Sequence, residues 1–223
     1  SMIANFLKSK NNKFKILIFD SKNSFTKKNI FLQEWREIYG DSIEWVSRKN
    51  GGLISRLEKK QIINSDGEKI KGDFIHIIPE QQAGKIIFDS KLCNSDWCKI
   101  NPQTFQLLNF KDIYVVGDSI DAGDMPKSAF SAESQAKILS LNLVNRILQK
   151  DYLDPVFLNT CYSFSSHDRA FSITSWYRLN SNNDRIVSLG SSQSSEDGLL
   201  NERLRESKEA YGWYESITKT LYG

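Results

Sequence analysis

The sequence predicts an α/β fold, and three features carry that prediction. Residues 113–116 form an apolar run without alternation, as expected for a strand covered on both faces of a parallel sheet. Residues 126–148 then place apolar side chains at helical spacing, and Ser65-Asp66-Gly67 is a hairpin signal. With 223 residues, the chain can bury a substantial core as one large domain or two small ones.

The beginning of the chain predicts two strands around a helix. Residues 14–19 are expected to form a buried strand that ends at Asp20. Residues 30–39 are expected to form a short helix that Gly40 stops, and residues 43–46 are a second candidate strand.

A hairpin and a further strand follow. Residues 61–64 and 68–71 flank the Ser-Asp-Gly turn, where glycine tolerates the positive φ that a tight turn demands. Residues 74–78 are expected to form a strand that Pro79 ends, with His76 in the core or on a face of the sheet.

The last third of the chain predicts two more strands and a helix. The strands are expected at residues 174–178 and 186–189, with a polar turn at residues 180–184 between them. Residues 191–195 are serine-rich and predict a surface loop, and a terminal helix is expected from about residue 200.

The segment at residues 112–135 carries the strongest ligand-binding signal. Gly117 lets the backbone turn sharply and approach a ligand, and Asp118 presents a carboxylate at the C-terminal end of the predicted strand, where open α/β sheets bind their ligands. Pro126 and Ser128 are start signals for a helix whose amides and positive dipole end favour an electron-rich ligand atom. The alternative, at least as common for this pattern alone, is a βα turn that binds no ligand.

This segment, DIYVVGDSIDAGDMPKSAFSAESQ, closely resembles the second FAD-contacting stretch of the flavoprotein subunit of flavocytochrome c sulfide dehydrogenase. That subunit is a relative of sulfide:quinone oxidoreductases and of the disulfide reductase superfamily. Further blocks resemble the same subunit in the same order, at residues 13–31, 73–86, 96–105, 159–164 and 212–217. The likeness therefore runs through nearly the whole chain.

The resemblance implies part of a flavoprotein with two dinucleotide-binding domains, followed by a C-terminal α+β flavin-binding and interface domain. Residues 1–82 would then belong to the NAD-domain-like module, residues 83–150 to the returning half of the FAD-binding domain, and residues 151–223 to the C-terminal domain. The family's G-x-G-x-x-G fingerprint and its first redox cysteine do not occur in this sequence. We therefore expect the C-terminal portion of a longer protein, with weak FAD binding or none and no sulfide oxidation by this portion alone.

The resemblance also implies roles for individual residues. Cys161 matches the family's second redox cysteine, whose sulfur lies over the flavin, although without the resemblance a buried structural thiol would be the more common interpretation. Trp213 matches a tryptophan near the flavin and the redox disulfide, and Asp118 would hold the ribityl chain. The resemblance implies five further cofactor-binding residues, Gly117, Pro126, Lys127, Ser128 and Ala129. The amides that follow Lys127 would face the flavin pyrimidine.

The implied reaction is sulfide oxidation. Sulfide would attack the cysteine disulfide, leaving a persulfide at one cysteine and releasing the other thiolate, which passes electrons through FAD to a c-type cytochrome subunit. FAD is thus the implied cofactor, a small sulfur compound the substrate, and the periplasm the compartment.

Cys93 and Cys98 have four residues between them. A local disulfide in an oxidising compartment is one interpretation, and two ordinary cysteines are the default. No second cysteine pair and no suitably spaced histidine accompanies them, so no metal site is predicted. His167, six residues after Cys161, is expected to cap a turn, and the alternative is that it tunes the Cys161 thiolate.

Composition restricts the partners. The net charge of +3 is small and dispersed, which argues against nucleic acid, and no apolar run approaches the about 18 residues that span a bilayer. A second hypothesis, of a different class, is a non-catalytic interaction module whose exposed apolar surface drives association, for example as a homodimer.

Overall fold

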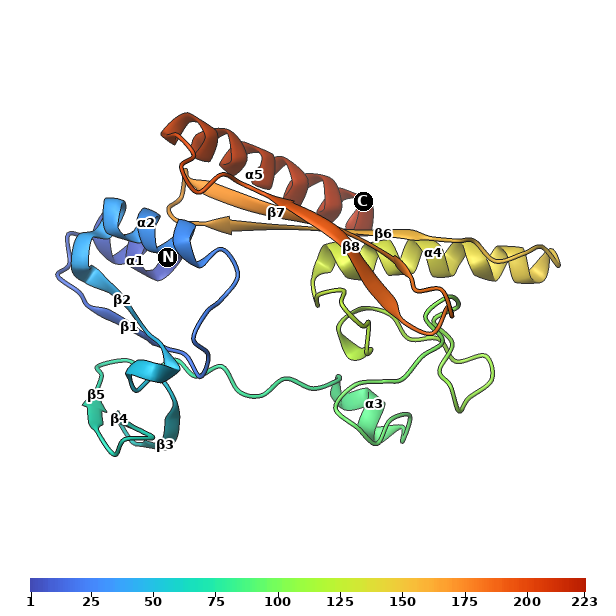
Figure 1. Ribbon diagram of the computed structural model, residues 1–223, viewed down its shortest axis with the longest axis horizontal. Helices are drawn as coiled ribbons and strands as arrows, with labels where there is room; N and C mark the ends of the chain where they lie inside the picture. Colours follow the sequence, from blue (N-terminus) through green and yellow to red (C-terminus); the bar gives the residue numbers. More distant parts are fainter. The chain divides into compact units, whose positions relative to one another are not determined.

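The computed structural model describes residues 1–223 as a mixture of helices and strands (Figure 1). The chain forms two compact units. The first joins Ser1–Ile78, Tyr162–Phe171 and Ser194–Gly223, and the second joins Pro79–Cys161 and Ser172–Gln193. The mixed helix-and-sheet class is confirmed, whereas the arrangement as dinucleotide-binding domains and the three family modules stay predictions.

The first unit opens with helices beside a short parallel sheet. Its elements are α1 Met2–Ser9, β1 Ile16–Phe19, α2 Lys28–Tyr39, the short 3-10 turn η1 Gly40–Ser42, β2 Ile43–Val46 and the similar turn η2 Arg48–Asn50. β1 and β2 run parallel, with Ile16 opposite Ile43. Trp35 and Tyr39, four residues apart on α2, share one helix face and pack with Ala4 into a core. The predicted strands and helix are confirmed, but β1 is not buried as expected, since Leu17 is 39% exposed. Helix α1 was not predicted.

The predicted hairpin is also confirmed. It belongs to a small antiparallel sheet of β3 Ile54–Glu58, β4 Gln61–Asn64 and β5 Lys69–Lys71, in that order. Gly67 has a φ of +82°, and the Asn64 side-chain oxygen accepts the amides of Asp66 at 3.1 Å and Glu68 at 2.8 Å.

The strand predicted at residues 74–78 is wrong. No neighbouring strand pairs with this segment, and Phe74 and Ile78 are each 79% exposed. His76 is likewise exposed rather than in a core or a sheet. The apolar composition was the signal for a strand, but a strand needs a partner for its backbone groups, and here none lies alongside.

A third sheet contains the longest strands, β6 Val156–Phe164, β7 Ala170–Leu179 and β8 Ile186–Gln193, in that order. Each of the two units contains part of β6 and part of β7, and β8 belongs to the second unit. The strands and the turn predicted between residues 174 and 189 are confirmed, with the Asn180 side-chain oxygen accepting the amides of Asp184 and Arg185. Residues 191–193 extend β8 rather than forming a loop. The terminal helix is α5 Leu200–Tyr222, as predicted.

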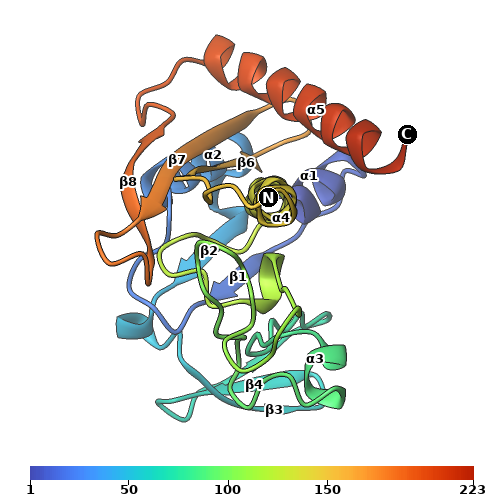
Figure 2. The ribbon, with the colours of Figure 1, turned by 90° about the vertical axis from the view of Figure 1, so that its right-hand side faces the viewer.

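The second unit places a long helix beside loops. It contains α3 Lys85–Asp89, the 3-10 turn η3 Gly117–Ser119 and α4 Ala129–Ile147. Figure 2 looks along α4 and shows the loops that precede it gathered beside this helix. Cys98, Phe105, Ile120 and Phe157 are fully buried in the core of this unit. None of the helices in the structure combines the length and the apolar character needed to cross a bilayer.

Residues 113–116 do not form the predicted strand of a parallel sheet. They are half-buried, and their pairing is an isolated antiparallel bridge between Gln106 and Tyr114. The amide of Leu107 donates to the Ile113 carbonyl at 2.8 Å, and the amide of Val115 donates to the Phe105 carbonyl at 3.0 Å. A loop thus satisfies the backbone of this apolar run, and its side chains pack on the core without a sheet.

Candidate functional site

The turn at Gly117 connects the 113–116 segment to α4. Gly117 has a φ of +78°, a conformation that glycine adopts without steric cost. Its amide donates to the side-chain oxygen of the buried Gln135 at 2.7 Å, which fastens the turn to α4. A Cβ at this position would meet Ala132 Cβ at an ordinary 3.4 Å, so the backbone conformation rather than space requires glycine.

The predicted ribityl-binding carboxylate, Asp118, follows within η3 and is exposed. The loop beneath it is fixed by two backbone hydrogen bonds of 2.9 Å, from the Cys98 amide to the Ser119 carbonyl and from the Asp121 amide to the Cys98 carbonyl. A carboxylate held at the surface in this way is able to accept hydrogen bonds from sugar or ribityl hydroxyls.

Lys127 is held over an aromatic ring just before α4. Its Nζ lies 3.6 Å from the centroid of the Trp97 ring and donates to the Ile120 carbonyl at 2.7 Å. Burial lowers the pKa of Lys127, and the charges of Asp118 and Asp121 act in the opposite direction. The turn therefore carries a positioned positive charge.

Ser128 begins α4 and also reaches into β6. Its Oγ accepts the Ser131 amide at 3.0 Å, which confirms it as the N-cap. The same hydroxyl donates to the side-chain oxygen of Asn159 at 2.5 Å, and the Ser131 hydroxyl donates to that oxygen at 3.3 Å. Asn159 in turn donates from its Nδ2 to the Cys161 sulfur at 3.3 Å.

Asn159 thus connects the start of α4 to the predicted redox cysteine. It is 2% exposed, and its two serine donors fix which way its amide points. Sequence patterns did not indicate this residue, because β6 was not predicted from them. The available signal is the spacing, since residues 159 and 161 lie on the same face of a strand.

The start of α4 suits an electron-rich ligand. The first amides of a helix have no acceptor inside the helix, and Ala129, the first helical residue, is exposed. No acidic residue lies in the first turn, while Lys127 precedes it and Pro126 is exposed at the surface beside it. These residues fit the pyrimidine edge of a flavin, where negative charge gathers on reduction.

Each of the remaining predicted residues has surroundings of its own. Trp213 belongs to α5 in the first unit, where its ring centroid lies 6.2 Å from that of Tyr162. His167 is exposed in the bend between β6 and β7, where its Nδ1 lies 3.7 Å from an Asp168 carboxylate oxygen. Cys93 and Cys98 are not joined in a disulfide. No group of three or more side chains of the metal-binding types gathers anywhere in the structure.

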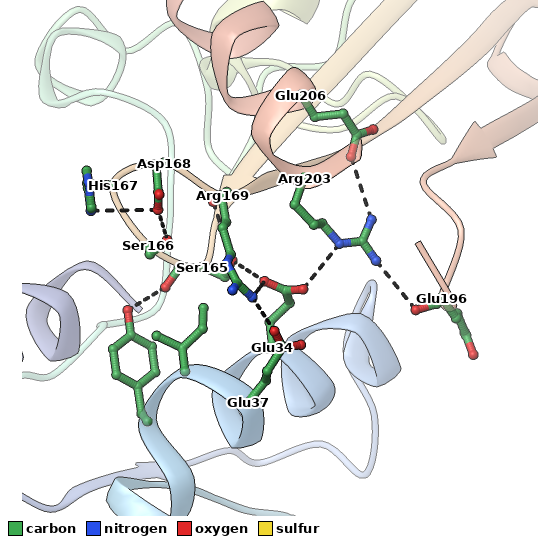
Figure 3. A network of polar contacts seen from close by, with 12 residues as sticks. Glu34, Glu37, Ser165, Ser166, His167, Asp168, Arg169, Glu196, Arg203 and Glu206 are labelled. Atoms are coloured by element: carbon green, nitrogen blue, oxygen red, sulfur yellow. Dashed lines mark hydrogen bonds and ion pairs between the residues drawn. The ribbon is translucent and has the colours of Figure 1, made fainter. Parts of the chain in front are cut away.

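A buried charge network stabilises the first unit (Figure 3). Glu34 of α2, 3% exposed, accepts from the Arg203 Nε of α5 at 3.3 Å and from the Ser165 hydroxyl at 2.7 Å. Arg203 is 1% exposed and also donates from Nη2 to the Ser195 carbonyl at 2.7 Å. Arg169 lies 3.8 Å from Glu34 and 2.7 Å from Glu37. The network therefore fixes α2, α5 and the β6–β7 turn to one another.

The turn before α4 and the thiol of Cys161 define a candidate flavin-dependent redox protein. Two family models match the chain and identify the family within this class of protein. Residues 1–79 match the central region of the sulfide dehydrogenase [flavocytochrome c] flavoprotein chain, and residues 153–221 match the flavin-binding region of flavocytochrome c sulphide dehydrogenase. Together they cover about two thirds of the chain, which belongs to the family of flavocytochrome c sulfide dehydrogenase flavoproteins.

The matched regions relate to the site in different ways. Cys161 and Trp213 lie inside the flavin-binding match, whereas the turn at residues 117–129 falls between the two matches. The Glu34–Arg203 contact joins the central match to the flavin-binding match within the first unit.

Proposed function

We propose that this chain supplies part of the flavin and sulfur site of a sulfide dehydrogenase flavoprotein, with electrons passing to a c-type cytochrome subunit in the periplasm. The observation that carries the proposal is the path from the start of α4 through Ser128 and Asn159 to Cys161. It connects the helix end suited to a flavin ring with the thiol suited to sulfur chemistry.

Each residue has a defined part in this proposal. Asp118 accepts hydrogen bonds from ribityl hydroxyls, and the amide of Ala129 with the charge of Lys127 faces the pyrimidine edge. Sulfide attack on a disulfide that includes Cys161 forms a new S–S bond at one cysteine and releases the other as a thiolate. The sulfide sulfur is thereby oxidised to a persulfide, and the electron pair of the broken bond stays on the released thiolate. Bound FAD would supply a two-electron acceptor that is able to release electrons singly, as a cytochrome partner requires.

Asn159 positions the sulfur for this reaction. Its amide group donates to Cys161 while two serine hydroxyls occupy its oxygen, so the sulfur has a fixed hydrogen-bond donor beside it. A fixed donor holds the sulfur in one position beside the start of α4. Asn159 is therefore a positioning residue in the proposed mechanism.

The test of flavin binding is a titration with FAD followed by amide resonances in ¹H–¹⁵N spectra, because this method detects weak binding. With FAD at up to about 1 mM, we expect the largest shifts at Gly117, Ala129 and Cys161. Substituting Lys127→Met removes the charge at the turn and is expected to weaken binding by about fivefold to tenfold.

The matched control is Lys137→Met, at the one lysine of α4, which is exposed and whose partner Glu133 lies one turn earlier. This change is expected to leave FAD affinity unaltered. Shifts scattered over both units, or equal effects of the two lysine changes, would show that the turn is not the flavin site.

Self-association is a second candidate function, favoured by one surface. Leu141 and Val144 of α4 and Leu148, the residue directly after the helix, are each more than half exposed and lie at helical spacing. An unpartnered apolar stripe of this kind promotes association, and we infer that a second copy of the chain covers it.

Sedimentation velocity measures this association. We expect a dimer that dissociates when Val144→Lys and Leu148→Lys place charges on the stripe. Monomers at every concentration of the unsubstituted chain would exclude it, and would leave the flavin proposal untouched.

A further inference from the structure

Cys93 and Cys98 are two thiols of the second unit that the proposed flavin and sulfur site does not use. Cys98 is fully buried in the core, and Cys93 is half-buried and packs against that core. The Cys93 sulfur lies 3.1 Å from the carbonyl oxygen of Trp97, the residue directly before Cys98, and each thiol shifts the pKa of the other. The pair follows α3, and the backbone of Cys98 pairs with the loop at Ser119 and Asp121.

Cys93 has the surroundings of an attacking thiol. The Ser95 amide donates to its sulfur at 3.4 Å, and the Ser95 hydroxyl lies 3.4 Å away. The Cys93 thiol in turn is able to donate to the carbonyls of Ser95 at 2.9 Å and Trp97 at 3.1 Å. Although burial alone raises the pKa of Cys93, the hydrogen bonds from Ser95 and Cys98 bring that pKa below its ordinary value. A larger fraction of Cys93 is therefore thiolate at neutral pH than for an ordinary cysteine.

Cys98 has the surroundings of a resolving thiol. Burial raises the pKa of Cys98 to about 11, and the negative charge of Cys93 and the hydrogen bond to it act in the same direction. The two contributions from Cys93 end once the Cys93 sulfur is held in a mixed disulfide and carries no charge. Cys98 then loses its proton more readily. This happens when the mixed disulfide at Cys93, the bond that Cys98 has to attack, is already formed.

We propose that Cys93 and Cys98 form a redox-active dithiol that reduces small organic disulfides and closes to an internal disulfide. The Cys93 thiolate attacks one sulfur of the disulfide RSSR, forming a Cys93–SR bond and releasing RS⁻, which takes up the proton that Cys93 lost. Cys98 then loses its proton and attacks the Cys93 sulfur, expelling the second RS⁻, which takes up that proton. In balance, two protein thiols and RSSR become one protein disulfide and two RSH, so the pair is oxidised and the small disulfide is reduced.

The position of the pair gives its oxidation a consequence nearby. Trp97 lies between the two cysteines in sequence, and its ring is the one under the Lys127 ammonium at 3.6 Å. A disulfide across Trp97 restrains the segment that carries this ring. The proposal itself stands on the two thiols and does not depend on flavin binding.

The test uses glutathione disulfide and intact-mass measurement on the full chain in a Cys161→Ser background, which leaves the pair as the only thiols. We expect the reduced protein to lose the mass of two hydrogen atoms, and non-reducing peptide mapping to locate the new bond between Cys93 and Cys98. Replacing Cys98→Ala stops the sequence at the first step, so that variant is expected to gain one glutathione at Cys93. Replacing Cys93→Ser is expected to slow all reaction at least tenfold, because only the buried thiol remains.

Two results would overturn the proposal. One is a stable glutathione adduct on Cys93 with Cys98 intact, which shows no resolving step. The other is faster reaction of the Cys93→Ser variant than of the Cys98→Ala variant, which reverses the roles. Circular dichroism of each variant establishes that the fold is retained, and Cys98→Ser serves as a second substitution if Cys98→Ala unfolds.

Discussion

The side chain of Asn159 joins the N-cap Ser128 to the thiol of Cys161. These two residues are 33 positions apart in the sequence. Both of those residues could be predicted from the sequence, the first from helix start signals and the second from family resemblance. Asn159 could not, because its two hydrogen bonds from Ser128 and Ser131 exist only when β6 lies beside α4.

The change Asn159→Asp tests this positioning role. It keeps the size of the side chain and its oxygen partners, but replaces the N–H donor next to the sulfur by a charged acceptor. A negative charge there opposes formation of the thiolate, so we expect alkylation of Cys161 by iodoacetamide to slow by about tenfold.

The matched control for that experiment is Asn145→Asp, an asparagine on α4 whose side chain bonds to the Asp151 carbonyl. Peptide mass spectrometry measures the labelling of each cysteine separately. An equal rate at Cys161 in both variants would mean that Asn159 does not act on the sulfur.

Tyr39 predicts a pH dependence in the first unit. Burial, followed by the charge of Asp168, raises the pKa of Tyr39 from 10.0 to about 12, and its hydroxyl donates to the Ser165 carbonyl at 2.6 Å. Because the folded pKa is above the unfolded one, this contribution is fully present below pH 10 and is lost between pH 10 and about 12. The loss amounts to about 2 kcal/mol.

Urea denaturation of the chain and of Tyr39→Phe across that pH range checks this expectation. Other groups also titrate there, so the difference between the two proteins carries the information. The stability difference between them is expected to shrink as the pH rises, and a constant difference would contradict the prediction.

Among the elements, α4 depends on its cap. Ser128→Ala removes the acceptor for the Ser131 amide and is expected to lower the free energy of unfolding by about 1 kcal/mol. Ser140→Ala on the same helix is the control, since that hydroxyl bonds only to the preceding turn at the Ala136 carbonyl. Denaturant titration should show little change for Ser140→Ala and recovery of stability with Ser128→Thr. Equal losses from the two alanine changes would show that the cap contributes nothing.

The elements also show where sequence patterns succeed. The hairpin at β4 and β5 and the start of α4 were predictable, because a positive φ at glycine and a serine cap act within a few residues. Residues 113–116 and 74–78 were mistaken for strands, because an apolar run identifies side chains that avoid water and does not identify a pairing partner. The turn proposed to contact the flavin therefore follows a looped segment rather than a strand of a parallel sheet.

At the scale of the whole molecule, the first unit is built from segments distant in sequence. Glu34 and Arg203 are 169 residues apart and both nearly inaccessible. Periodicity places Arg203 on a helix, but only the fold shows that it is buried against a carboxylate. A sequence pattern would assign an arginine to the surface, as is correct for its neighbour Arg205.

Removing this buried arginine should be costly. Arg203→Met leaves Glu34 buried without that cation, and we expect a loss of about 3–5 kcal/mol in the free energy of unfolding. Arg205→Met breaks an exposed pair with Glu209 on the same helix and is expected to change stability by less than about 1 kcal/mol. Thermal and urea unfolding of both variants compare the two pairs directly, and similar losses would show that the network contributes no more than a surface ion pair.

The central claim is that Cys161 and the flavin site at the start of α4 are one site. The most direct test is the rate of alkylation of all three cysteines in the presence and absence of saturating FAD, resolved by peptide mass spectrometry. If the claim holds, FAD slows labelling of Cys161 severalfold and leaves Cys93 unchanged as an internal reference. Unaltered labelling of Cys161 at FAD concentrations where binding is saturated would contradict it.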